Sequence, residues 1–184
     1  MAYELNASYT AVEEGFVEEA AKTLLGSYSR IEHCLKQLSE EQVWWRARPE
    51  MNAIGNLLLH LAGNVEQWVT APIENRAAAR NRPAEFAQRE PIAKSELQST
   101  LANAVGRAAE LIRTLATAEQ LLALRRVQGH DTNVLAAVFH SVTHFEGHAQ
   151  EIISMTRQIK GESYEFQWVP KSKEQGSASE ASGA

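Results

Sequence analysis

The segment "NAIGNLLLHLAGNVEQWV", residues 52–69, has the apolar spacing of an α-helix that buries one face. Its inward positions, three or four residues apart, are Ile54, Leu57, Leu58, Leu61, Val65 and Trp68. Asn52 is a candidate N-cap, and Pro72 ends the pattern. The sequence therefore predicts a helix from Asn52 to about Thr70, with His60 near the middle of an apolar stretch.

Three other segments have the same helical periodicity, and they cover residues 5–38, 95–116 and 131–160. Ser95 and Gln98 match a capping box, and either Asp131 or Thr132 can cap the last helix, which Gly161 can end. Runs that alternate with period two are scarce. The sequence predicts an all-α fold with four long helices and no sheet of consequence.

The connections between these helices differ in length. "SEEQ" at Ser39 and "TAEQ" at Thr117 match capping boxes, so each predicts a short helix. Residues 73–92 mix arginine, glutamate and two prolines with few apolar anchors, which is typical of a long surface connection between the second and third long helices.

The C-terminal region divides into two parts. The segment "GESYEFQW" alternates apolar and polar residues, so we expect Phe166 and Trp168 to pack back onto the bundle. The last residues are small and polar and cannot repay their ordering entropy. We expect one helical-bundle domain over residues 1–170 and a disordered tail over residues 171–184.

Composition excludes several classes of protein. With 44% hydrophobic and 22% charged residues, the chain is typical of a globular domain rather than of a membrane protein. A net charge of −5 argues against nucleic acid as a partner. The first residues lack a basic segment followed by an apolar run, so we expect a cytoplasmic protein. Cys34, the single cysteine, can form no internal disulfide.

"HSVTHFEGH", residues 140–148, places three histidines at four-residue intervals on one helix. His144 and His148 can converge on one ion, whereas His140 lies about 12 Å from His148 along the axis, too far to share it. A third ligand must come from another helix, and His60 is the obvious candidate because its apolar surroundings require a partner. The alternative is a solvated polar helix face.

Two familiar kinds of metal site do not fit. Zinc proteases have a glutamate directly after the first histidine of the pair, where this chain has Phe145. Di-iron bundles have a glutamate three residues before each histidine, but Leu57, Ser141 and Phe145 occupy these positions.

Two nearby polar residues are candidates for the chemistry. Glu151 shares the helical face of His148, where it could be a fourth ligand, orient an imidazole, or accept a proton. Asn64, one turn after His60, could orient a ligand or the substrate. The alternative is an exposed helix glutamate for Glu151 and local hydrogen bonding within the helix for Asn64. Glu146 points away from this face, and we expect it to be solvated.

The pairing of residues 52–69 with "VFHSVTHFEGHAQEII", residues 138–153, resembles the DinB/YfiT-like superfamily of metalloenzymes. The final "YEFQWVPK" resembles an uncharacterised branch of that superfamily. The resemblance implies a four-helix bundle with up-down-down-up connectivity, often a homodimer. It also implies one divalent ion held by His60, His144 and His148, whereas Glu151 stands where the family often has glutamine.

Characterised relatives in this superfamily include thiol S-transferases and a thiol-dependent isomerase. By resemblance, the expected activity is a thiol S-transferase that acts on a small molecule with a low-molecular-weight thiol. Zinc or nickel is the expected metal, and iron also fits imidazole ligands. The alternatives are a metal-dependent hydrolase and a non-catalytic, metal-binding or dimerising, stress-related bundle.

Overall fold

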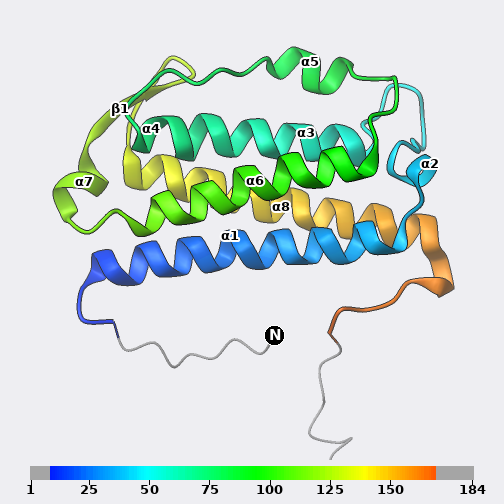
Figure 1. Cartoon of the computed structure of the whole chain (residues 1–184), viewed down its shortest axis with the longest axis horizontal. Coiled ribbons are helices and arrows are strands. Elements are labelled where there is room, and N and C mark those ends of the chain that lie inside the picture. The colour runs from blue at the N-terminus through cyan, green and yellow to red at the C-terminus, as the bar shows by residue number, and fades with distance from the viewer. Residues whose placement is uncertain (1–8, 169–184) are drawn as a thin grey trace, which may run out of the picture.

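The structure, a computed structural model, describes residues 9–168 and is a four-helix bundle, as predicted (Figure 1). The long helices are α1 (Val12–Gln37), α3 (Ile54–Val65), α6 (Lys94–Arg113) and α8 (Val134–Lys160). A π-helical turn, η1 (Glu66–Thr70), and a short helix, α4 (Ala71–Ile73), continue α3. The remaining short helices are α2 (Glu40–Val43), α5 (Arg82–Ala87), α7 (Ala118–Leu122) and η2 (Gly161–Ser163).

The long helices pack in a ring in which α1 and α3 each contact both α6 and α8. The His33 ring, late in α1, contacts the backbone carbonyl of Glu165 beyond α8, at 2.7 Å. Lys94, at the start of α6, donates to the carbonyl of Leu38, just past α1, at 2.7 Å. Therefore α1 and α8 run one way and α3 and α6 the other, around a fully buried apolar core that includes Phe145.

The structure contains a short element that the sequence did not predict, a β-hairpin of two four-residue strands. Strands β1 (Leu124–Val127) and β2 (His130–Asn133) pair antiparallel through a two-residue turn, Gln128 and Gly129. Both turn residues have positive φ, 51° and 83°, as a type I′ turn requires. The usual turn sequences have asparagine, aspartate or glycine at the first position, so glutamine gave no signal for the hairpin.

The helix caps were predicted with mixed success. The capping boxes at Ser39 and Thr117 are confirmed. Gly161 ends α8, as predicted. The other N-caps were wrong: Ala93 caps α6 without a side-chain bond, Ala53 rather than Asn52 caps α3, and Asn133 caps α8. The last error follows from the hairpin, because Asp131 and Thr132 lie in β2.

Two expectations about the surface were also wrong. Phe166 and Trp168 do not pack back onto the bundle, because they are 59% and 57% exposed. Glu146 is not solvated: its carboxylate accepts from the Ser27 hydroxyl and pairs with Arg30, which ties α8 to α1. The expected tail, residues 171–184, lies outside the described residues. No helix of the described part is long and apolar enough to cross a membrane.

Candidate metal centre

The packing of α3 against α8 brings His60, His144 and His148 together. His60 lies in the middle of α3, and the other two lie one turn apart in the middle of α8. One ring nitrogen from each side chain lies within 4.8 Å of the others, and the Nε2 atoms of His60 and His144 are 2.9 Å apart. His60 is buried, whereas the two histidines of α8 are partly exposed, so the cluster is open on one side.

These separations fit a single ion. Zinc binds imidazole nitrogens at about 2.0–2.1 Å in tetrahedral geometry, which places two ligand nitrogens roughly 3.3 Å apart. The shortest separation, 2.9 Å between His60 and His144, lies below this value, and the 4.8 Å limit for the whole set lies above it. Small side-chain rotations would therefore make the three nitrogens equidistant ligands. Three protein ligands leave a coordination position for a substrate or water.

Carboxylates hold the outward nitrogens of two of these histidines. The Glu85 Oε2 atom lies 3.1 Å from His60 Nδ1, and the Glu151 Oε2 atom lies 2.7 Å from His148 Nδ1. At His148 the carboxylate favours the tautomer with the proton on Nδ1, so Nε2 is left as an unprotonated ligand atom. At His60 the Nη2 atom of Arg80 also lies 3.0 Å from Nδ1, so this nitrogen faces a donor as well as the Glu85 carboxylate. A carboxylate at the outer ring nitrogen is typical of histidines that bind metal.

Glu85 is itself held by a buried arginine. The Arg80 side chain is 2% exposed, and it donates to Glu85 through Nε and Nη2 at 2.7 and 2.8 Å. This pair lies directly on the backbone of α3 at Gly63, where an added Cβ would come within 2.2 Å of the Glu85 carboxylate. Arg80 also donates to Gln67 Oε1 at 2.8 Å. Glu85 therefore reaches His60 only because position 63 has no side chain.

Sequence reasoning missed Arg80 and Glu85. Both belong to residues 73–92, which we predicted to be a surface connection, but α5 forms there and packs against α3. A signal was present in Asn81, which caps α5 by accepting from the Ala84 N–H, and in Phe86, whose ring lies 4.7 Å from that of His60. These residues indicate a short amphipathic helix, but they do not indicate which long helix it packs against.

The other candidates lie beside the cluster. Asn64 is buried, and its Oδ1 accepts from the Ser141 hydroxyl at 2.8 Å, which ties α3 to α8. Within residues 9–168, no hydrogen bond joins Asn64 to the three histidines. His140 lies outside the ligand group, with its ring 4.2 Å from Trp68 and stacked 5.9 Å from that of His144.

Burial keeps His60 and His144 neutral. Together with the charges of four neighbours, burial lowers the pKa of His144 to about 4, and these neighbours are His148, His60, His140 and Arg80. Burial also lowers the pKa of His60, although the hydrogen bond to the Glu85 carboxylate acts in the opposite direction. At pH 7 both rings are therefore in the form that binds a metal.

We expect the metal-free protein to lose stability as the pH falls from 6.5 towards 4. In this range the unfolded chain binds a proton at position 144 that the folded chain does not bind, so lowering the pH favours unfolding. The loss should be on the order of 2 kcal/mol, allowing for the partial exposure of the ring. Urea denaturation across this pH range measures it. The variant His144→Gln should show a shallower dependence, and equal slopes for both proteins would contradict the argument.

The fold is shared with solved bacterial structures. A conserved protein from Enterococcus faecalis matches with a TM-score of 0.66 and 15% identity over 79% of this chain and 97% of its own. YfiT from Bacillus subtilis, described as "a probable metal-dependent hydrolase with an unusual four-helix bundle topology", matches with a TM-score of 0.66 and 13% identity over 83% and 93%. A DinB-like protein, YjoA, from the same organism has a TM-score of 0.62 and 13% identity over 83% and 99%.

Sequence comparison gives the family. Among curated protein sequences there is no match. The family described as "Protein of unknown function (DUF1572)" matches residues 11–173, which is nearly the whole chain and includes all three histidines. The chain belongs to this family, and it shares its fold with YfiT and with a DinB-like protein, as the resemblance predicted.

Proposed function

We propose that the protein is a metal-dependent enzyme in which His60, His144 and His148 hold one divalent ion. The observation that carries the proposal is the convergence of three ring nitrogens from two helices, two of them backed by a carboxylate. Simple solvated histidines do not require a buried ion pair such as Arg80–Glu85 behind them. Imidazole ligands suit zinc or nickel, and iron is the third choice.

The residues of this site have different roles. When bound, the ion would lower the pKa of a thiol or water in the open position and so supply a nucleophile at neutral pH. Glu85 orients His60 from the buried side. Glu151, with its side chain 49% exposed, orients His148 from the solvent side and is the carboxylate best placed to receive a proton from an incoming molecule. Asn64 holds the two ligand helices in register through Ser141.

Our first choice of reaction is the transfer of a low-molecular-weight thiol to an electrophilic small molecule. The second is metal-dependent hydrolysis, which is favoured by the description of YfiT as a probable hydrolase of the same fold. A metal-binding bundle without turnover is the remaining alternative. We also propose that the protein acts as a homodimer in the cytoplasm, which size-exclusion chromatography and fractionation would test.

Elemental analysis of protein purified without a chelator or added metal tests the proposal first. We expect near one equivalent of one divalent metal per chain. The loaded protein is then assayed with thiols and electrophiles, and separately with ester and amide substrates without thiol. Product that requires thiol supports transfer, and product without thiol supports hydrolysis. A metal-loaded protein that turns over none of these substrates would favour the non-catalytic bundle, and a protein that takes up no metal would exclude the site.

A further inference from the structure

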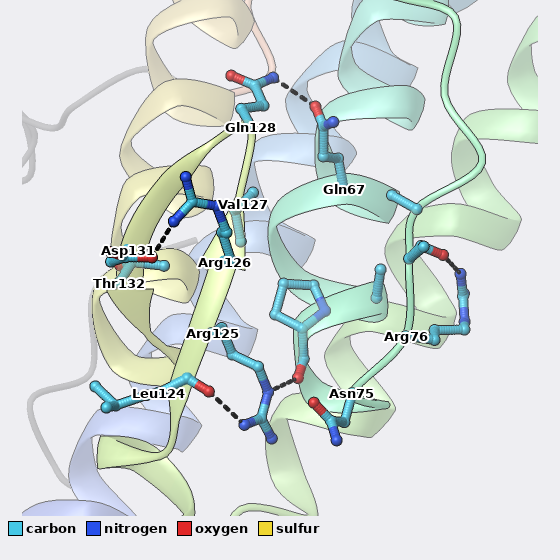
Figure 2. Close-up of a pocket in the computed structure, with 14 residues that line it drawn as sticks. Gln67, Asn75, Arg76, Leu124, Arg125, Arg126, Val127, Gln128, Asp131 and Thr132 are labelled. Atoms are coloured by element: carbon cyan, nitrogen blue, oxygen red, sulfur yellow. Dashed lines mark hydrogen bonds and ion pairs between the residues drawn. The ribbon is translucent and has the colours of Figure 1, made fainter.

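A cavity lies beside the hairpin (Figure 2), and none of the three histidines lines it. Its volume is about 690 Å³, within the range of small-molecule sites. Its walls come from β1 and β2, from the end of the η1–α4 segment, and from residues 75–78. The nearest lining residue to the cluster along α3 and η1 is Gln67, seven positions after His60 and so about 10 Å along the axis.

The lining of this cavity is positively charged. Three arginines and one aspartate contribute to it, which gives a formal charge of +2. Arg126 pairs with that aspartate, Asp131, at 2.8 Å, and Arg76 pairs with Glu66 and Glu74 outside the lining, each at 2.6 Å. Arg125 differs, since within residues 9–168 it has no carboxylate partner. It leaves one positive charge in the cavity uncompensated.

Backbone carbonyls hold the Arg125 guanidinium in place. Its Nε donates to the Pro72 carbonyl at 2.5 Å and its Nη1 to the Leu124 carbonyl at 2.7 Å, so that it bridges α4 and β1 (Figure 2). Carbonyls orient an arginine without neutralising it. In the part of the chain that the structure describes, Nη2 has no hydrogen-bond partner. An arginine fixed in this way can donate to an anion at little entropic cost.

Two tight turns border the cavity. Asn75 and Gln128, with φ of 54° and 51°, are the two non-glycine residues with positive φ in the described chain, and both line this cavity. The Gln128 side chain donates to Gln67 Oε1 at 2.5 Å, and the same oxygen accepts from Arg80. Hydrogen bonds thus link the cavity to the pair that orients His60.

We infer that this cavity binds a carboxylate group of a small molecule, with Arg125 as the residue that recognises it. A single unpaired guanidinium matches one negative charge, which favours a carboxylate over a phosphate dianion. The carboxylate belongs either to the substrate or to a separate small acid. In the first case the substrate must span roughly 18 Å along the helix axis, because Arg125 bonds Pro72, twelve positions after His60. Only this assignment to the substrate rests on the proposed metal function.

Calorimetric titration of metal-free protein with glutarate tests the site itself. We expect binding that weakens with added salt, that is at least about tenfold weaker in Arg125→Gln, and that is absent for the neutral glutaramide. Arg113→Gln is the matched control, because Arg113 is an α6 arginine that pairs with Glu18 away from the cavity, and it should bind glutarate like the wild type. Arg125→Lys, which keeps the charge but loses the fixed geometry, should bind with intermediate affinity.

Several outcomes would overturn the inference. If the wild-type protein does not bind glutarate and Arg125→Gln only lowers the melting temperature, Arg125 serves only as a cap for α4. Equal binding by Arg125→Gln and wild type would place the anion elsewhere. If Arg125→Gln fails to fold, Arg125→Lys takes its place in this test. Glutarate binding by Arg125→Lys as tight as that of the wild type would then also place the anion elsewhere. These measurements need no metal, so their failure is distinct from failure of the proposed enzyme.

Turnover by the metal-loaded protein then distinguishes the two sources of the carboxylate. If the substrate carries it, Arg125→Gln should raise KM for acidic substrates about tenfold and leave KM for their neutral amides unchanged, and glutarate should compete with the acidic substrates. If a separate acid carries it, glutarate should change the rate on a neutral substrate without competing. Either pattern supports a carboxylate site.

Discussion

Replacing His60 with alanine is expected to lower the affinity of the protein for its divalent ion by about 100- to 1000-fold. Structural zinc sites with four ligands contribute about 10–16 kcal/mol, which is roughly 3–4 kcal/mol for each ligand. The loss should be similar for His144→Ala and His148→Ala. Titration with zinc in competition with a chelator of known affinity measures it, and circular dichroism checks that the helices remain.

His140→Ala is the matched control for this series. His140 lies on the same face of α8, one turn before His144, but outside the group whose nitrogens converge. We expect its replacement to change the affinity by less than about tenfold, since it only stacks on a ligand ring. A loss in His140→Ala as large as that in His60→Ala would mean that His140 also binds the ion and that the assignment of three ligands is wrong.

Gly63→Ala is expected to separate Arg80 and Glu85 from the metal centre without touching a ligand. The new Cβ would lie 2.2 Å from Glu85 Oε1 and 2.8 Å from Arg80 Nε, so the pair must move off α3. Without Glu85 and Arg80 at Nδ1, His60 loses the contacts that fix the orientation of its ring, and the metal affinity should fall by about 10- to 100-fold. Displacing a buried ion pair should also lower the free energy of unfolding by about 1–3 kcal/mol.

Gly106→Ala is the control for the helical substitution itself. Gly106 lies within α6, and an added Cβ there would meet nothing within 4 Å. We expect it to raise the free energy of unfolding by up to about 1 kcal/mol, because alanine favours a helix more than glycine does. Urea denaturation and zinc titration of both variants make the comparison. Wild-type metal affinity in Gly63→Ala would show that the Arg80–Glu85 pair does not position His60.

The bundle and the three candidate ligands were predictable because the spacing of residues within each helix indicates them. His144 and His148 share a face of α8 by the four-residue rule, and the apolar stretch around His60 required a buried partner. His60 and the pair His144 and His148 each lie near the middle of a predicted helix, and the structure brings them together where α3 packs against α8.

The outer part of the site was not predictable in the same way. Arg80 and Glu85 are charged residues in a polar segment, and solvent exposure is the usual state of such residues. Their burial depends on α5 packing over Gly63, a contact between segments that no local pattern records. Glu146 was misplaced for a similar reason: the helical face that points away from the triad is covered by Ser27 and Arg30 of α1.

The π-helical turn η1 has a consequence for how the two sites are spaced. A π-turn holds one residue more than an α-turn, so it is equivalent to a single-residue insertion between Val65 and Ala71. Without that residue, everything beyond it would rotate by roughly 100° about the helix axis, and the Pro72 carbonyl would leave Arg125. The register between the histidine cluster and the hairpin cavity thus depends on the length of the chain by one residue. A one-residue deletion in η1 would therefore move the cavity relative to the histidine cluster without replacing a side chain in either site.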